Sequence, residues 1–147
     1  MTAKTQKVRE LLLSGYNCAQ AIVGAYCEDL GLDFETAIRL SSSFGGGMGG
    51  LKEVCGALSG VFMIAGLKYG YTDSTDADAK AAHYALIQKI AERFREKEQS
   101  ILCRDLLERL SKKDPDELPE EYKKRPCLGI VETAAEIAEE VISGRIL

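Results

Sequence analysis

The stretch VCGALSGVFMIAGLKY, residues 54–69, carries no charge before Lys68 and is apolar around most of a helix circumference. A helix that is apolar on nearly all sides belongs in a core, so we predict a central helix from residue 51 or 52 to residue 69. The uncharged run between Glu53 and Lys68 is well short of the roughly 20 apolar residues that cross a bilayer. We therefore expect a core helix and no membrane insertion.

Outward from this stretch, the apolar spacing is helical along almost the whole chain, and no segment alternates with a period of two for long. The sequence predicts an all-α fold: one domain, residues 1–147, built as a bundle of six to seven helices around the central glycine-containing helix. The other expected helices cover residues 3–13, 18–30, 33–40, a long segment from 75 or 76, 101–110 and 126–142.

The long predicted helix has one apolar face and one charged face. Ala82, Leu86, Ile90 and Phe94 recur every four residues and should cover the core, while the charged run 92–97 should mostly face water. The stretch 114–126 is expected to be an exposed, proline-broken connection.

Charge and cysteine content limit the class of protein. The 147 residues carry a net charge of -4, with a pI near 5.1, so a nucleic-acid partner is not expected. The N-terminal 15 residues have dispersed charges and only a three-leucine apolar run, unlike a signal peptide, and we expect a cytoplasmic location. Because cytosolic reductants keep ordinary disulfides open, the five cysteines indicate metal binding or redox chemistry.

Four of the cysteines fall near the predicted start of a helix: Cys18, Cys55, Cys103 and Cys127. Unpaired N–H groups and the positive end of the helix dipole should favour a thiolate there, the form that binds metals and attacks disulfides. Mainly apolar residues follow each at i+3, i+4 and i+7, so all four should point inward, and we predict one shared site. Cys27 lies about half a helical turn out of phase with Cys18 and is predicted to be separate.

Glycines near Cys55 are candidate cofactor-binding positions. Gly56 and Gly60 stack on one helix face and leave room for a neighbouring helix or a bound centre. The loop GGGMGG, residues 45–50, includes Gly47, and its N–H groups could face an anion or a cluster sulfur near Cys55; simple loop flexibility is the alternative.

Three other side chains have two interpretations each. Arg104 and Arg125 adjoin Cys103 and Cys127, where they either lower the thiol pKa values and stabilise an anionic cluster or project into solvent. His83 is the only histidine, and we expect a half-buried residue with satisfied hydrogen bonds rather than a ligand or a base.

The hexapeptide CGALSG, residues 55–60, fits a CGAxxG motif, and it occurs with NCAQA around Cys18 and with Cys103 and Cys127 downstream. Over nearly its whole length the chain resembles the C_GCAxxG_C_C family, whose members are described as redox-active; the family label writes GC where this chain has CG. The resemblance implies a small helical protein with four characteristic cysteines. Related domains joined to a multihaem cytochrome are understood to hold an iron–sulfur centre, which favours a cluster here.

We therefore expect a redox protein in which Cys18, Cys55, Cys103 and Cys127 bind an iron–sulfur cluster, [2Fe-2S], for electron transfer or redox sensing. One alternative is a cofactor-free thiol–disulfide oxidoreductase that uses the same four residues as redox thiols. Another is a four-thiolate zinc protein without turnover. The expected partner is a redox protein or a small thiol, and the bare apolar helix leaves a homodimer open.

Overall fold

The computed structural model describes residues 2–146, and its architecture confirms the predicted all-α fold class. The helices are α1 (Ala3–Leu13), α2 (Cys18–Tyr26), α3 (Phe34–Ser41), α4 (Gly45–Met48), α5 (Gly56–Tyr69), α6 (Ala77–Glu98), α7 (Cys103–Ser111), α8 (Glu120–Lys124) and α9 (Leu128–Ile142). Three single 3-10 turns join them: η1 (Glu28–Leu30), η2 (Ser42–Phe44) and η3 (Pro115–Glu117). Within residues 2–146, no helix combines the length and hydropathy that a membrane span requires.

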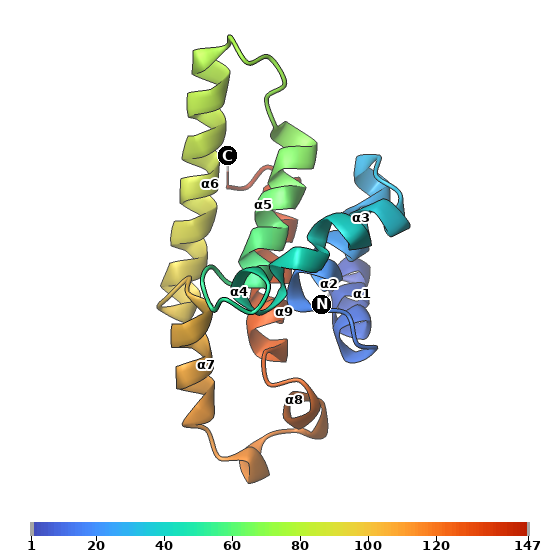
Figure 1. Cartoon of the computed structure of the whole chain (residues 1–147), viewed down its shortest axis with the longest axis vertical. Helices are drawn as coiled ribbons and strands as arrows, with labels where there is room; N and C mark the ends of the chain where they lie inside the picture. The colour runs from blue at the N-terminus through green and yellow to red at the C-terminus, as the bar shows by residue number, and fades with distance from the viewer. Residues whose placement is uncertain (1, 147) are drawn as a thin grey trace.

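Helix α5 occupies the middle of the bundle, where it packs against α2, α6 and α9 (Figure 1). Its side chains Leu58, Val61 and Ile64 are completely buried, as the uncharged sequence predicts. Burying each such side chain contributes about 1.5–3 kcal/mol, so this one helix supplies a large part of the stabilisation of the core.

The crossing of α5 with α2 depends on Gly60. A Cβ atom at this position would lie 2.9 Å from Ile22 Cβ and 3.2 Å from the carbonyl oxygen of Ala19. The small helix face predicted at Gly60 therefore serves close helix packing, and Gly60 does not line the cavity described below.

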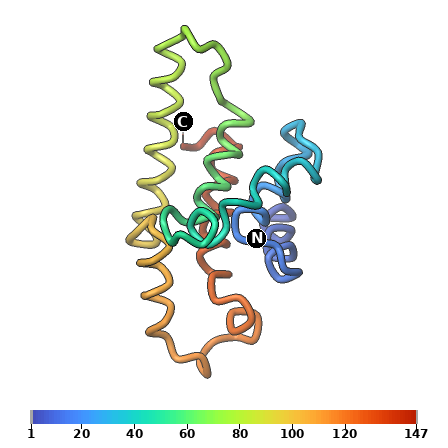
Figure 2. The backbone as a smooth tube through the Cα atoms, viewed as in Figure 1, coloured from blue at the N-terminus to red at the C-terminus, as the bar shows by residue number. Residues whose placement is uncertain are grey.

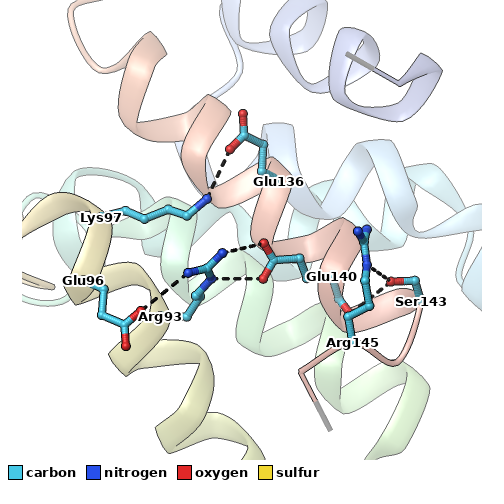
Figure 3. Close-up of polar contacts among 7 residues, drawn as sticks. All are labelled: Arg93, Glu96, Lys97, Glu136, Glu140, Ser143 and Arg145. Atoms are coloured by element: carbon cyan, nitrogen blue, oxygen red, sulfur yellow. Dashed lines mark hydrogen bonds and ion pairs between the residues drawn. The ribbon is translucent and has the colours of Figure 1, made fainter.

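Helix α6 is held to the bundle mainly by apolar contacts, with ion pairs at its edge. Leu86, Ile90 and Phe94 are buried, as predicted, whereas Ala82 is exposed because the first turns of α6 extend beyond the core. Arg93 donates to Glu140 at 3.2 Å, and Lys97 lies 3.4 Å from Glu136 (Figure 3), so these two cations bridge to α9 instead of facing water freely. Because the Arg93 side chain is 41% exposed, each such pair is worth only up to about 1 kcal/mol.

His83 departs from the expected environment. It is half-buried and packs edge-on against Tyr71, with ring centroids 6.1 Å apart. Within the described part of the chain its Nδ1 atom is buried and has no hydrogen-bond partner, so the expectation of satisfied hydrogen bonds is wrong. The exposed alanines beside it on α6 carry no polar side-chain group that could reach this nitrogen.

The central helix begins later than predicted, at Gly56 rather than residue 51 or 52. Val54 pairs with Leu102 in an isolated antiparallel bridge: the Cys55 N–H donates to the Ile101 carbonyl at 2.8 Å, and the Cys103 N–H donates to the Glu53 carbonyl at 2.6 Å. These bonds use backbone groups that a longer helix would need. They also place the segment before α5 beside the turn between α6 and α7 (Figure 2).

Three other boundaries differ from the prediction for local reasons. Helix α2 stops at Tyr26 and continues as η1, α7 begins at Cys103, and α9 begins at Leu128. The start of α7 is delayed because the Leu102 N–H donates to the Ser100 hydroxyl at 3.1 Å while Leu102 pairs with Val54. The predicted exposed connection 114–126 also contains the short helix α8.

Gly60→Ala should lower the free energy of unfolding by roughly 1–3 kcal/mol, because the added methyl group overpacks against Ile22. Urea unfolding followed by circular dichroism measures the change. Gly66→Ala in the same helix is the matched control: a Cβ there meets nothing within 4 Å, so it should raise stability by roughly 0.5–1 kcal/mol. Equal effects of the two substitutions would contradict the packing role of Gly60.

Candidate functional site

Four cysteines stand at the N-termini of four different helices. Cys18 is the first residue of α2 and Cys103 is the first residue of α7. Cys55 and Cys127 are one step earlier, as the N-cap residues of α5 and α9. The predicted association of these cysteines with helix starts is therefore present at every one of the four positions, although Cys55 precedes its helix instead of lying within its first turn.

The four helix starts surround one cavity of about 230 Å³. All four cysteines line it, with further walls from Asn17, Gly46, Lys52, Gly56, Leu106, Leu107, Arg125, Ile130 and Val131. Cys27 is elsewhere, buried with Val23 and Ala37 in a separate apolar cluster. The fold thus brings together Cys18, Cys55, Cys103 and Cys127, which are as much as 109 positions apart along the chain, and leaves Cys27 apart.

A capping box fixes Cys18 at the cavity. The Asn17 side chain accepts the Gln20 N–H at 2.9 Å, and the Gln20 side chain accepts the Asn17 N–H at 3.1 Å. The Asn17 amide also donates to the carbonyl of Ser42 at 3.1 Å, which ties the start of α2 to the segment that follows α3. Each reciprocal cap of this kind satisfies two helix-end donors, so the first turn of α2 is well defined.

The bridge between Val54 and Leu102 places Cys55 opposite Ile101 and Cys103 opposite Glu53, so the two cysteines lie diagonally across the bridge on one face. Arg104 reinforces this connection from outside: it donates to the Lys52 carbonyl at 3.1 Å and forms an ion pair with Glu53 at 2.7 Å. Arg104 is exposed and does not line the cavity, so of its two predicted roles the structure favours the solvent-facing one.

Arg125 takes the opposite role and faces the cavity. Its guanidinium donates to the carbonyl of Leu12 and, at 3.2 Å, to the carbonyl of Tyr16. These carbonyls lie at the end of α1 and just after it, and the Leu12 carbonyl also accepts the Gly15 N–H at 3.2 Å. Arg125 therefore joins α1 to the start of α9 while placing positive charge beside Cys127.

The sequence analysis did not identify two residues as part of the cavity wall, Asn17 and Lys52. Lys52 has a φ of 62°, a left-handed conformation that is unusual for a residue with a side chain. Its position two residues before the bridge, and three before Cys55, is the only sequence signal that relates it to the site. Burial raises the pKa of both Cys103 and Cys127, and the Lys52 charge opposes part of that increase.

Two of the predicted glycines leave space that the cysteines use. A Cβ at Gly56 would lie 2.5 Å from the Cys18 sulfur, and a Cβ at Gly47 would lie 2.6 Å from Cys103 Cβ. Gly47 also has a φ of 70°, so both its conformation and its surroundings require glycine. Of the three glycines named from the sequence, Gly56 lines the cavity. Gly47 does not line it but packs against Cys103, and Gly60 packs against Ile22 of α2.

The thiol pKa values are governed by burial. The pKa of Cys55 is raised from 9.0 to about 12, mainly by desolvation and secondly by the nearby Cys18, while the backbone N–H groups of Leu58 and Ala57 oppose the increase. Burial also raises the pKa of Cys103 and of Cys127. The expectation that helix starts make these cysteines thiolates is therefore wrong for the metal-free chain at three positions, since loss of hydration outweighs the helix N–H groups.

All five thiols are free, so the cavity contains no disulfide. Across residues 2–146, no three His, Cys, Asp or Glu side chains are arranged to hold a single metal ion. The four cysteines line the wall of the cavity. A water molecule occupies about 30 Å³ in the liquid, so a void of about 230 Å³ is much larger than one ion fills.

Comparison with known proteins identifies the family. Residues 16–141 match the family described as "Putative redox-active protein (C_GCAxxG_C_C)", which covers all four cavity cysteines. The chain belongs to this family. The family match confirms the resemblance derived from the CGALSG hexapeptide and the three other cysteines, and it identifies the chain with a redox-active class of proteins. No curated protein and no solved structure matches the chain.

In the metal-free, reduced protein, stability should fall as pH rises above about 9. The unfolded Cys55 thiol ionises near its ordinary pKa of 9.0, whereas the folded one holds its proton until about 12, so the unfolded state is favoured between these values. The loss should reach about 1.4 kcal/mol per pH unit. Cys55→Ala lacks this contribution, so denaturant unfolding at pH 8 and 10.5 should show a smaller loss for the variant; parallel losses would contradict the assigned cause.

Proposed function

We propose that Cys18, Cys55, Cys103 and Cys127 bind an iron–sulfur cluster, most simply [2Fe-2S], and that the protein transfers electrons or senses redox state. The observation that carries the proposal is the convergence of four helix-start cysteines on a single cavity. Four cysteine thiolates are the standard ligand set of this cluster type. When bound, the cluster would supply one-electron chemistry, while the chain holds it, excludes water and balances its charge.

The cations at the cavity support the proposal. An oxidised [2Fe-2S] core is a dication, and four thiolate ligands leave the bound group with two negative charges. Lys52 and Arg125 line the cavity and supply the same amount of positive charge. Because burial opposes any uncompensated charge, this balance suits an anionic cluster better than four isolated thiolates.

The shape of the cavity also fits a group larger than one ion. Gly56 leaves room beside the Cys18 sulfur, and Leu106, Ile130 and Val131 provide apolar walls. Structural zinc requires four ligands that meet around one tetrahedral ion. The volume of the cavity therefore favours a cluster over zinc.

A cofactor-free dithiol is the second candidate, and one observation supports it: Cys18 is close enough to influence the charge on Cys55, Cys103 and Cys127 alike. Cys18 could thus pair with more than one partner. However, a nucleophilic thiol must ionise near neutral pH. Burial raises the pKa of the three other thiols, so we favour a metal-bound site.

Protein purified without oxygen should contain two irons and two sulfides per chain and absorb in the visible range. Cys18→Ser should lose at least half of the iron, since Cys18 is one of the four proposed cluster ligands. Iron and sulfide assays, the absorption spectrum and the electron paramagnetic resonance signal of the reduced protein provide the measurements.

Cys27→Ser is the matched control, because Cys27 is buried outside the cavity and should leave the iron content unchanged. One equivalent of zinc with no sulfide would refute the cluster. A metal-free protein in which mild oxidant converts cavity thiols to a disulfide would establish the dithiol alternative.

Gly56→Ala should reduce iron incorporation by about ten-fold, because the methyl group would occupy space 2.5 Å from the Cys18 sulfur and displace that ligand. Gly129→Ala offers a matched comparison: it lies two residues after Cys127, and its Cβ would make only an ordinary 3.6 Å contact with Tyr122. Iron content relative to folded protein, with folding checked by circular dichroism, distinguishes the two variants. Equal iron contents would exclude this role for Gly56.

A further inference from the structure

Exposed apolar side chains are concentrated along residues 39–52, the segment that contributes Gly46 and Lys52 to the wall of the cysteine cavity. We call residues 39–52 the cavity cover. Five large apolar side chains in the described chain are exposed, and three belong to the cover: Leu51 (70% exposed), Leu40 (56%) and Met48 (37%). The other two, Leu67 and Tyr84, lie on α5 and α6 away from the cavity. A local concentration of this kind marks an interaction surface more often than single scattered residues do.

The cover is also positively charged. It begins with Arg39 and ends with Lys52, and no acidic residue lies between them, although the whole chain has a net charge of -4. Arg39 and Lys52 are both exposed to solvent. The cover is therefore a cationic, partly apolar surface on an acidic protein, and its charge is complementary to a partner whose surface is acidic.

The cover is thin where it meets the cavity. Gly46 lines the cavity directly, and Gly47 lies against Cys103, so only backbone separates parts of the outer surface from the sulfurs. The Met48 carbonyl accepts the Leu51 N–H at 3.2 Å, which folds the exposed part of the cover into a tight turn. In Figure 1 this region, with α4, crosses in front of the start of α5. Electron transfer slows steeply with distance, so a partner docked on the cover beside Gly46 would be close to the site.

We propose that the cavity cover is the docking surface for an acidic electron-carrier protein, which binds through Leu40, Met48 and Leu51 with Arg39 and Lys52 at the rim. This inference rests on the proposed redox function and identifies the class of partner. An apolar centre with a charged rim is the usual anatomy of such an interface. Rim charges of this kind mainly raise the association rate and make it depend on salt.

The test uses oxidised flavodoxin, an acidic electron carrier, as the probe. Amide shifts of the ¹⁵N-labelled protein at low ionic strength should change within residues 39–52, and the dissociation constant for Arg39→Glu/Leu51→Ser should rise about ten-fold. The control variant Leu67→Ser/Lys68→Glu also replaces one leucine by serine and one cation by glutamate, but on α5, away from the cover. It should alter the dissociation constant by less than about two-fold. Binding that avoids the cover, or that the cover variant leaves unchanged, would overturn the proposal.

Electron transfer gives the second measurement. In stopped-flow experiments with reduced flavodoxin, the cover variant should lose about ten-fold in second-order rate constant, while its rate with dithionite, a small reductant, is retained. With basic cytochrome c, which carries the opposite charge to flavodoxin, the second-order rate constant of the cover variant should not fall in this way. A dimer that Leu51→Ser dissociates would assign the surface to a second copy and overturn the proposal. The amide shifts report docking whether or not a cluster is present. If the protein binds flavodoxin at the cover but contains no cluster, the proposed cluster function is refuted and the docking surface is not.

Discussion

Two backbone hydrogen bonds, from Cys55 to Ile101 and from Cys103 to Glu53, connect segments that are almost fifty residues apart and hold the site in register. They end any helix that would precede α5 and delay the start of α7, so both helices begin at the same place. Without this pairing, Cys55 and Cys103 would still lie at helix starts but would have no reason to share a cavity. The capping box at Asn17 and the Arg125 bonds to the end of α1 bring the other two cysteines to the same point.

The chemistry of the cavity follows from a competition between helix ends and burial. Each helix start offers N–H groups that favour a thiolate, but removal from water costs more, and Cys55 therefore keeps its proton. Burial likewise raises the pKa of the Cys103 and Cys127 thiols. In the proposed function, the iron ions of a bound cluster would reverse this balance, because their positive charge compensates the thiolates directly.

The sequence predicts features that depend on nearby residues and misses those that depend on distant ones. The burial of α5, the Asn17 cap and the position of four cysteines at helix starts all follow from local patterns. The bridge at Val54 does not, because its partner Leu102 lies far along the chain and only two residues pair. Lys52 was missed for the same reason. The sign of the thiol pKa shifts was also wrong, since the helix-end effect is local whereas desolvation comes from the whole fold.

The glycine-rich cover resolves two requirements that conflict. It must fit closely against Cys103, which favours glycine at Gly47, and it must adopt a left-handed backbone, which favours glycine at Gly46. Yet a loop of glycine alone loses much conformational entropy on folding and offers no side chains to a partner. Met48 and Lys52 provide side chains at left-handed positions, each at a cost of roughly 1–2 kcal/mol. Hydrogen bonds from Lys52 to Gly46 and from Glu53 to Gly47 oppose that cost and close the turn. A segment that needed only to connect α3 with α5 would have no use for such strain, so these two side chains are best explained by what they present at the cavity and at the outer surface.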